Sequence, residues 1–385
     1  MVTRLTRLSG TIVLVLGLCT VAFELGARRG DPPGGLPPAF AVLEEVYADV
    51  SARGVEPPPD AALLDGAVEG MVEALGDEYA EYYDAQEFSA LENALDGRFV
   101  GIGVVLEDTE VGLTVQTVLP DSPAERAGLE PGEQIVEVDG ADVSDTPSDL
   151  VVDRVRGEEG STVVLGLRGG SAGDREVSVV REQLEVPNTE ARLLDGGVGY
   201  VALRQFTQGA GADVTQEVRA LLDEGAQALV LDLRGNPGGY LPAAIDVANV
   251  FVSDAQVVRV GRDPETATEY RAEDDALAPD VPLAVLVDGG SASASEIVAG
   301  ALQDLDRADL IGTTTFGKGT VQTITDLPDD RGLKFTTDRY YTPSGDSIDG
   351  VGIAPDRVVE DGEGEDDPQL DAAQQTLVAA LSGSA

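Results

Sequence analysis

The sequence predicts an α/β protein whose core is built on a mainly parallel sheet, with a β-rich domain inserted ahead of it and a helical region at the N-terminus. In the core, 186–385, buried apolar runs at 228–234 and 282–288 are each followed by a turn of small residues and a helical pattern. Repeated strand–turn–helix units build parallel sheets, whose functional groups gather at the carboxyl ends of the strands. Short β-runs broken by turn residues fill 97–185, and helical patterning precedes them.

Residues 1–30 are interpreted as a signal peptide or a signal anchor. Two arginines precede an apolar run at 8–23, and two more follow it. The run is short for a membrane span, but the Thr-Val-Ala sequence at 20–22 is only a fair cleavage site, which slightly favours an uncleaved anchor. The rest of the chain is therefore expected outside the cytoplasm, anchored to the cell membrane by this segment or secreted if it is cleaved.

Residues 31–96 are expected to contain a linker and a helical region. The linker, 31–38, reads D-P-P-G-G-L-P-P, and helical patterning then runs from about 39 to 95, interrupted by three prolines at 57–59. The stretch G-D-E-Y-A-E-Y-Y at 76–83 leads toward the inserted domain.

The composition excludes several classes of function. The chain has 25 basic and 71 acidic residues, a net charge of -46 that repels nucleic acids along most of its length. It contains no histidine, which removes Ser-His-Asp and Cys-His catalysis and nearly every familiar catalytic zinc site. A single cysteine, Cys19, rules out an internal disulfide, and no spaced carboxylate cluster indicates a metal. We expect no cofactor and no metal, and any hydrolase in this chain needs a base other than histidine.

A serine at the start of a core helix is a candidate nucleophile. Residues 291–296 read S-A-S-A-S-E between a buried strand and a helix, where helix N-terminal amides favour negative charge. The same residues satisfy the S-x-x-E pattern of a capping box from Ser293 to Glu296, so Ser293 could serve only to begin the helix. Taken alone, the pattern favours the cap, and only a nearby base would favour the nucleophile.

Lys318 is the candidate base. It is one of two lysines in a chain that otherwise uses arginine, and a desolvated ε-amine can lose its proton whereas a guanidinium cannot. Gln322 lies on the same side of the following β-like run, where its amide oxygen could accept from the amine. The alternative is a surface lysine in a hairpin turn. Lys334, the other lysine, is expected on a strand, pointing to solvent or to an acidic neighbour.

A glycine-rich turn follows the first of these buried strands. The sequence R-G-N-P-G-G at 234–239 can expose consecutive backbone N–H groups, which acyl transfer requires where a carbonyl oxygen becomes an oxyanion. A phosphate-binding loop is the alternative, although the P-loop lysine and the G-x-G-x-x-G spacing are absent.

The inserted segment, 97–185, contains V-G-L-T-V-Q-T-V, P-D-S-P-A-E-R-A-G-L and G-E-Q-I-V-E-V-D-G in this order. This succession of strand, short helix, strand and turn resembles a PDZ domain of the bacterial type. In that family a loop, here Gly101-Ile102-Gly103-Val104, offers backbone N–H groups to a peptide's C-terminal carboxylate, and the peptide adds a strand to the sheet. The alternative is that these glycines only turn a strand.

Five motifs occur along the chain in this order: G-R-F-V-G-I-G-V, L-D-L-R-G-N-P-G-G, S-A-S-A-S-E-I-V-A-G-A-L, F-G-K-G-T-V-Q and Y-Y-T-P-S-G. Together they resemble the carboxyl-terminal processing peptidases, S41-family serine endopeptidases with a Ser-Lys dyad, a crotonase- or ClpP-like core and a PDZ domain. The resemblance implies that Ser293 is the nucleophile, Lys318 the base and Gln322 its assistant. It also implies that the backbone N–H groups of Ala294 and Gly239 form the oxyanion hole.

The implied function is extracytoplasmic proteolysis, in which the PDZ domain binds substrate C-termini and the dyad cleaves peptide bonds through an acyl-enzyme. Expected partners are proteins or peptides with free C-termini, and the membrane through the N-terminal segment only. A homodimer is a further expectation, for which the helical regions at 39–95 and 367–382 are candidates. The alternative function is a non-catalytic PDZ scaffold or chaperone that binds C-terminal tails, and mutation of the dyad separates the two.

Overall fold

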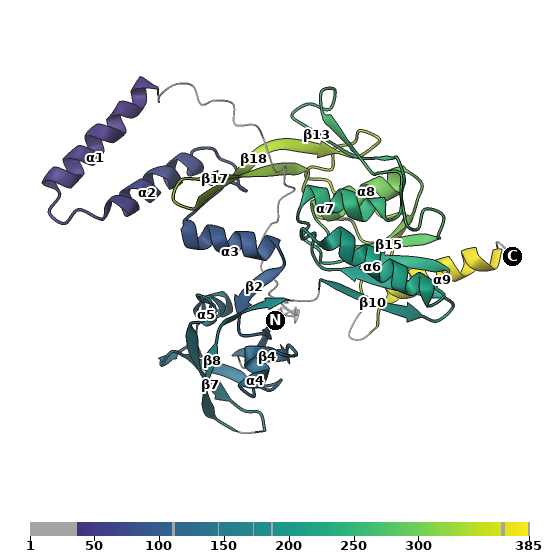
Figure 1. Cartoon of the computed structure of the whole chain (residues 1–385), viewed down its shortest axis with the longest axis horizontal. Helices are drawn as coiled ribbons and strands as arrows, with labels where there is room; N and C mark the ends of the chain where they lie inside the picture. Colours follow the sequence, from purple (N-terminus) through teal and green to yellow (C-terminus); the bar gives the residue numbers. More distant parts are fainter. Residues whose placement is uncertain are drawn as a thin grey trace, which may run out of the picture. The chain divides into compact units, whose positions relative to one another are not determined.

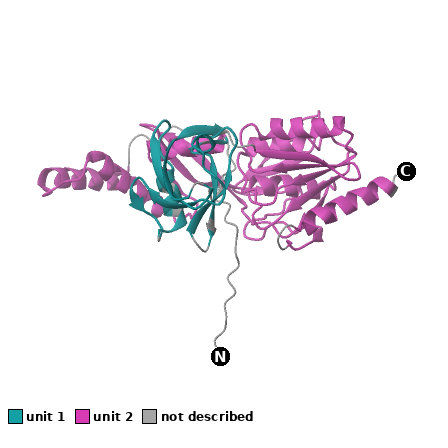
Figure 2. Cartoon of the chain, turned by 90° about the horizontal axis from the view of Figure 1, so that it is seen from below, with its two compact units in different colours: residues 1–18, 97–186 teal, residues 19–96, 187–385 magenta. Residues whose placement is uncertain are grey.

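The computed structural model describes residues 37–109, 112–144, 146–171, 173–185, 188–362 and 366–383. The chain divides into two compact units (Figure 2). One is Gly97–Val186, and the described residues on either side of it form the other, which we call the core unit. The apolar run at 8–23, with Cys19, lies outside the described residues. Within the described ranges, no helix has the length and apolar character that a membrane span requires.

A six-stranded sheet lies at the centre of the core unit (Figure 1). From β11 to β19 its neighbouring strands run parallel, whereas β10 pairs with β11 antiparallel. Every side chain of β11, β12 and β15 is buried, which explains the continuous apolar runs in the sequence. In their order across the sheet, the strands are β10 Thr189–Leu194, β11 Val198–Leu203, β12 Ala228–Asp232, β15 Leu283–Val287, β16 Asp309–Gly312 and β19 Arg357–Val358.

Helices cover both faces of this sheet. On one face, α6 (Ala210–Asp223), α7 (Leu241–Asn249) and α8 (Ala294–Asp304) bury their apolar sides in a single hydrophobic cluster. On the other face, α9 (Pro368–Gly383) packs in a second cluster. Because β12 and β15 are parallel neighbours, the loops that lead from them into α7 and α8 lie at the same edge of the sheet.

A second sheet of the core unit is antiparallel throughout, which the prediction of a mainly parallel core did not include. Its longest hairpin joins β17 (Thr320–Leu327) to β18 (Arg331–Tyr341), and β18 also pairs with β1 and β13. The remaining strands are β1 Glu81–Tyr83, β13 Gln256–Gly261 and β14 Thr268–Arg271. The parallel description therefore applies to one of the two sheets in the core unit.

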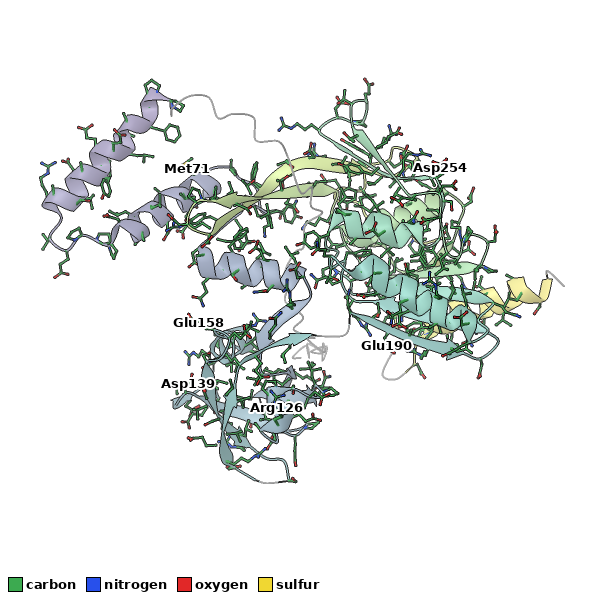
Figure 3. All side chains as sticks on the ribbon, viewed as in Figure 1. Met71, Arg126, Asp139, Glu158, Glu190 and Asp254 are labelled. Atoms are coloured by element: carbon green, nitrogen blue, oxygen red, sulfur yellow. The ribbon has the colours of Figure 1, made fainter. Side chains whose placement is uncertain are left out.

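The N-terminal part of the core unit is helical with one interruption. After a short 3-10 helix at Pro38–Phe40, α1 (Ala41–Arg53) and α2 (Asp60–Glu73) contain no buried residue, and Met71 of α2 is 51% exposed (Figure 3). α3 (Ala85–Leu95) begins at a capping box and buries one apolar face. The stretch between α2 and α3 corrects the expectation of helix up to residue 95, because it forms a turn and then β1, which pairs with β18.

The unit Gly97–Val186 is a β-rich domain with its own hydrophobic core. Its main sheet has the order β3-β4-β5-β7-β8, so β3 is an edge strand. Arg181 donates to two backbone carbonyls at the end of α5, and fully buried Glu133 pairs with Arg175. The elements are β2 Arg98–Gly101, β3 Val104–Thr109, β4 Gly112–Val118, α4 Pro123–Arg126, β5 Gln134–Val138, β6 Ala141–Asp142, α5 Ser148–Val155, β7 Thr162–Arg168, β8 Arg175–Val180 and β9 Glu182–Glu185.

Candidate active site

Ser293 ends the loop after β15 and stands at the N-terminus of α8. It is fully buried, and its backbone has φ 55° and ψ -111°, a conformation that residues other than glycine rarely adopt. Its backbone N–H donates to Glu296 Oε2 at 2.9 Å, but its Oγ has no hydrogen-bond partner among the described residues. Glu296 thus supplies its half of the capping box, while the Ser293 hydroxyl is left available for chemistry.

Lys318 lies in the loop before β17 and is 2% exposed, so it is not a surface lysine. Its Nζ lies 4.5 Å from the centroid of the Tyr79 ring, which belongs to the turn before β1. Burial disfavours the charged form of an amine, whereas an aromatic face favours it. Lys334 is also buried, and its Nζ lies 2.7 Å from Glu81 Oε2, the acidic neighbour expected for it.

Glu296, which the sequence explains only as a capping residue, connects the two candidate residues. Its carboxylate is fully buried, and Oε2 accepts the backbone N–H groups of Ser293 and Lys318, both at 2.9 Å. Its Oε1 accepts from Thr315 Oγ1 at 2.6 Å and from the Gly317 N–H at 2.7 Å. These donors satisfy a buried carboxylate that would otherwise be costly, and they hold the Lys318 loop against the start of α8.

Tyr340 of β18 lies against the same carboxylate. Its hydroxyl is 3.3 Å from the Ser293 carbonyl oxygen and 3.4 Å from Glu296 Oε2. The pKa of Tyr340 lies well above its usual value; burial is the larger cause, and the charge of the Glu296 carboxylate is the next. The phenol therefore keeps its proton and remains a hydrogen-bond donor within this site.

Gln322 lies on β17 and is fully buried, and two threonines orient its amide. Nε2 donates to Thr320 Oγ1 at 2.8 Å and to Thr336 Oγ1 at 3.3 Å. Oε1 has no hydrogen-bond partner among the described residues. The oxygen is therefore the end of the amide that is available to an amine.

The glycine-rich loop after β12 lies directly against Ser293. Gly238 has φ +107°, and a Cβ at this position would lie 2.9 Å from Ser293 Cβ and 3.0 Å from the Ala294 nitrogen, so only glycine fits. Buried Asn236 holds the loop in shape by accepting the Gly238 N–H through Oδ1 at 2.9 Å. Gly239 follows with φ +147°, again in the region that favours glycine. The loop thus places Gly238 against Ser293, and Gly239, the next residue, packs against the backbone of Phe206.

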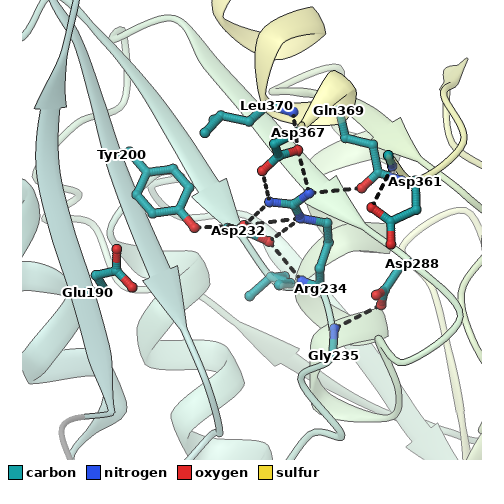
Figure 4. A network of polar contacts seen from close by, with 12 residues as sticks. Glu190, Tyr200, Asp232, Arg234, Gly235, Asp288, Asp361, Asp367, Gln369 and Leu370 are labelled. Carbon is teal, nitrogen blue, oxygen red and sulfur yellow. Dashed lines mark hydrogen bonds and ion pairs between the residues drawn. The ribbon is translucent and has the colours of Figure 1, made fainter. Parts of the chain in front are cut away.

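Arg234 anchors the beginning of this loop to the C-terminal helix (Figure 4). Its guanidinium donates to Asp232 at the end of β12 and, at 2.8 and 2.9 Å, to the two oxygens of Asp367 just before α9. It also donates to Gln369 Oε1 at 3.0 Å, and the Tyr200 hydroxyl donates to Asp232 at 2.8 Å. Burial alone would lower the pKa of Arg234, but the hydrogen bonds to the two carboxylates outweigh it and raise this pKa above its usual value. The first residue of the loop is therefore fixed between the sheet and α9.

The expected peptide-binding loop lies in the unit Gly97–Val186. Gly101 ends β2, Ile102 is 2% exposed in the hydrophobic core of this unit, and Val104 begins β3. Gly103 has φ +84°, and a Cβ there would lie 2.2 Å from Ser122 Cβ, so the position requires glycine. The loop leads directly into the edge strand β3, which has an unpaired side to which a peptide strand can add.

The core unit therefore gathers a buried hydroxyl, a buried amine, a buried amide and a loop of closely packed glycines. This set of groups can perform acyl transfer through a serine nucleophile. Among the residues that the structure describes, no group of three or more His, Cys, Asp or Glu side chains could hold a metal ion. Two features of the site were not predicted from the sequence: the role of Glu296 as a shared anchor, and the turn that carries Tyr79.

Comparisons with known proteins agree with these features. The model of peptidase family S41 matches residues 197–359, and a PDZ domain model matches residues 114–169. A carboxy-terminal-processing protease of Bartonella bacilliformis is 37% identical over 327 residues, which cover 83% of this chain and 75% of that protein. The carboxy-terminal processing protease CtpA of Bacillus subtilis is 30% identical over 364 residues, with coverage of 94% and 77%. A solved structure of a photosystem II D1 C-terminal processing protease matches with a TM-score of 0.53 and 30% identity, covering 84% of this chain and 87% of that one.

Proposed function

Because the chain belongs to peptidase family S41 and is a serine-type peptidase with a PDZ domain, we propose that Ser293 and Lys318 form its catalytic dyad. The neutral amine of Lys318 takes the proton from Ser293 Oγ as that oxygen attacks the carbonyl carbon of a peptide bond. The backbone N–H groups of Ala294 and Gly239 stabilise the oxyanion that forms. The protonated amine then gives its proton to the leaving nitrogen, and water hydrolyses the acyl-enzyme.

The shared carboxylate of Glu296 carries this proposal. Ser293 and Lys318 belong to different elements, yet their backbone N–H groups donate to the same Glu296 oxygen, both at 2.9 Å. Their backbone nitrogens are therefore no more than twice that distance apart. Both side chains are buried, and the Ser293 hydroxyl has no hydrogen-bond partner among the described residues. A nearby base is the feature that favours Ser293 as a nucleophile over a simple capping residue.

We propose further that the substrates are proteins and peptides with free C-termini, held by the loop Gly101–Val104. The loop's N–H groups would bind the terminal carboxylate, and the peptide would pair with β3. The PDZ match over residues 114–169 and the position of β3 at the sheet edge support this assignment. The names of the Bartonella and Bacillus relatives also describe carboxy-terminal processing.

Cleavage of an unstructured protein such as casein by the full chain tests the dyad. We expect Ser293→Ala and Lys318→Ala each to lower kcat by about 1,000-fold or more, because each removes a group that acts in the chemical step. Lys334→Arg is the matched control, since it changes the other buried lysine and should keep the activity. A second set of assays compares substrates that differ only in a free or an amidated C-terminus, and the amidated form should be cleaved more slowly.

Three outcomes would contradict these proposals. Full activity in both dyad variants would exclude Ser293 and Lys318 from catalysis. Binding of C-terminal peptides without cleavage by the unmodified chain would instead support the non-catalytic scaffold. Equal cleavage of free and amidated substrates would remove the role of the carboxylate, whatever the dyad variants show.

We also propose that the chain acts outside the cytoplasm, anchored by residues 1–30 or released from them. We further propose that two copies of the chain form a homodimer in which α1 and α2 make the contact. The arginines that flank the apolar run support the location. The absence of buried residues in α1 and α2, with Val42 and Val46 more than half exposed, supports the pairing. Protease accessibility in intact cells tests the location, and light scattering of the full chain tests the pairing, which a monomeric mass would contradict.

A further inference from the structure

We propose that the turn between α2 and β1 is part of the active site and that Asp77 is a positioning residue for Gln322. This inference rests on the proposed dyad of Ser293 and Lys318. The turn is far from these residues in the sequence, and in the sequence it only leads toward the inserted domain. In the structure it contacts both the strand beside Gln322 and the amine of Lys318.

Asp77 binds Thr336 of β18 through both of its carboxylate oxygens. Oδ2 accepts the Thr336 N–H at 2.7 Å, and Oδ1 accepts from Thr336 Oγ1 at 3.1 Å. Oδ1 also accepts the Tyr79 N–H at 3.0 Å, which folds the turn around the carboxylate. The contact joins residues 259 positions apart and holds the turn against the hairpin that carries Gln322.

These contacts set the direction of a hydrogen-bond relay. An ionised carboxylate has no hydrogen to donate, so the Thr336 hydroxyl must donate to Asp77 and can only accept from other groups. The group that reaches Thr336 Oγ1 is the Gln322 amide, at 3.3 Å. The end of the amide that faces Thr336 must therefore be Nε2, which also donates to Thr320 Oγ1 at 2.8 Å. Asp77 thus determines which end of the Gln322 amide points toward Thr336.

The other end of the amide is the one that the proposed mechanism needs. Gln322 Oε1 is buried and has no hydrogen-bond partner among the described residues. An amide oxygen can accept a hydrogen from the Lys318 amine and orient its lone pair, whereas an amide NH2 in the same place would set one donor against another. The same turn places the Tyr79 ring 4.5 Å from Lys318 Nζ. One turn therefore contacts the base directly and orients the amide assigned to it.

Asp77→Asn tests the relay because asparagine has nearly the same shape but carries a donor at one end. In one orientation its NH2 meets the Thr336 N–H, and in the other it donates to Thr336 Oγ1 but meets the Tyr79 N–H. The second arrangement lets the Thr336 hydroxyl donate to Gln322, which reverses the Gln322 amide. We expect kcat to fall by roughly 10- to 100-fold, since misplacement of a catalytic group costs about this much, while KM changes little.

A double-mutant cycle with Gln322→Ala separates orientation from general support of the fold. If Asp77 acts through Gln322, Asp77→Asn should lower kcat in the wild-type background but cost less than about twofold in the Gln322→Ala background. Glu81→Gln is the matched control. Glu81 lies at the start of β1 and ties this segment to β18 through Lys334, and its carboxylate accepts from Lys334 and Tyr83 rather than from Gln322. This control should keep the wild-type kcat.

The outcomes are distinct for the inference and for the proposed dyad. Equal fold losses in both backgrounds, or wild-type kcat in Asp77→Asn, would overturn the role of Asp77 while Ser293→Ala and Lys318→Ala stay inactive. Activity in those two variants would instead overturn the dyad itself. Thermal unfolding of every variant shows whether it is folded. If Asp77→Asn does not fold, Thr336→Val takes its place in the cycle with the same expectations, because it removes the relay hydroxyl from the other side.

Discussion

Glu296 holds the candidate nucleophile and the candidate base through one side chain. Each of its oxygens accepts two strong hydrogen bonds, from Ser293 and Lys318 on one side and from Thr315 and Gly317 on the other. Glutamine offers a single acceptor oxygen, so Glu296→Gln leaves two buried donors facing an NH2 group, at about 1–3 kcal/mol for each unsatisfied group. We expect a melting temperature several degrees lower and a larger loss of kcat, measured by calorimetry and casein cleavage.

Asp356→Asn is the control for this prediction. The Asp356 carboxylate accepts the Leu310 N–H at 2.8 Å and a hydrogen of Gln303 Nε2 at 3.0 Å, rather than groups of Ser293 or Lys318. Its loss should lower the melting temperature but leave kcat unchanged. A folded Glu296→Gln variant with wild-type kcat would show that Glu296 does not position the dyad.

Single residues could be predicted from the sequence where a local anomaly marks them. Lys318 is marked by its rarity, and Ser293 by its place between a buried strand and a helix. Glu296 could not be recognised as an anchor because the S-x-x-E pattern already explains it, while its other donors lie in the loop 315–318. Asp77 gives no local signal, since its partner Thr336 lies on a strand 259 residues later.

Among the elements, the strand–turn–helix units were predictable and the antiparallel sheet was not. β12 and β15 are continuous apolar runs, and the helices after them follow small-residue turns, so each signal lies within a few residues. β1 is three residues long, and its pairing with β18 depends on contacts far along the chain. The turn before it was therefore assigned to the helical region, although it carries Asp77 and Tyr79 to the site.

The contact between Arg234 and α9 leads to a prediction about that helix. Arg234→Lys keeps the charge but loses the bidentate pair with Asp367 and the bond to Gln369. The lost charged hydrogen bonds should cost about 1–3 kcal/mol. We expect faster amide exchange in α9, and a lower kcat because Arg234 begins the loop that carries Gly239. Hydrogen exchange with mass spectrometry, together with the casein assay, measures both effects.

The control is Arg204→Lys, which alters an ion pair with Glu190 whose side chains are 55% and 51% exposed. Exposed pairs contribute little, so this variant should match the wild type.

The partner of Arg234 adds a pH dependence. Burial alone would raise the pKa of Asp367, but hydrogen bonds from Arg234 and the Leu370 N–H bring it below its usual value. The contribution of Asp367 is then present above the ordinary carboxyl pKa of about 4 and is lost as the pH falls below it. Unchanged exchange in α9 of Arg234→Lys would contradict this anchor.

The molecule as a whole carries a net charge of -46, and its self-repulsion should make stability depend on salt. Salt shortens the distance over which surface carboxylates repel, from about 30 Å at 0.01 M to about 10 Å at 0.1 M. We expect the melting temperature of the full chain to rise by about 5 °C or more between 0.02 and 0.5 M NaCl. Equal ionic strengths of NaCl, KCl and choline chloride should act alike, because screening does not depend on which cation is present.

At low salt, mild acid should also raise the melting temperature of the chain. Burial, followed by the charges of Asp326, Asp96 and Asp330, raises the pKa of Glu92, and burial also raises the pKa of Asp213. A carboxyl whose pKa is raised by folding binds its proton more tightly in the folded chain, so lowering the pH toward 5 should stabilise the fold. Calorimetry at pH 8 and pH 5 in 0.02 M NaCl measures this, and the gain from added salt should be smaller at pH 5. A melting temperature that falls with salt, or differs between the three cations, would mean that specific ion binding rather than repulsion between carboxylates controls the stability of the chain.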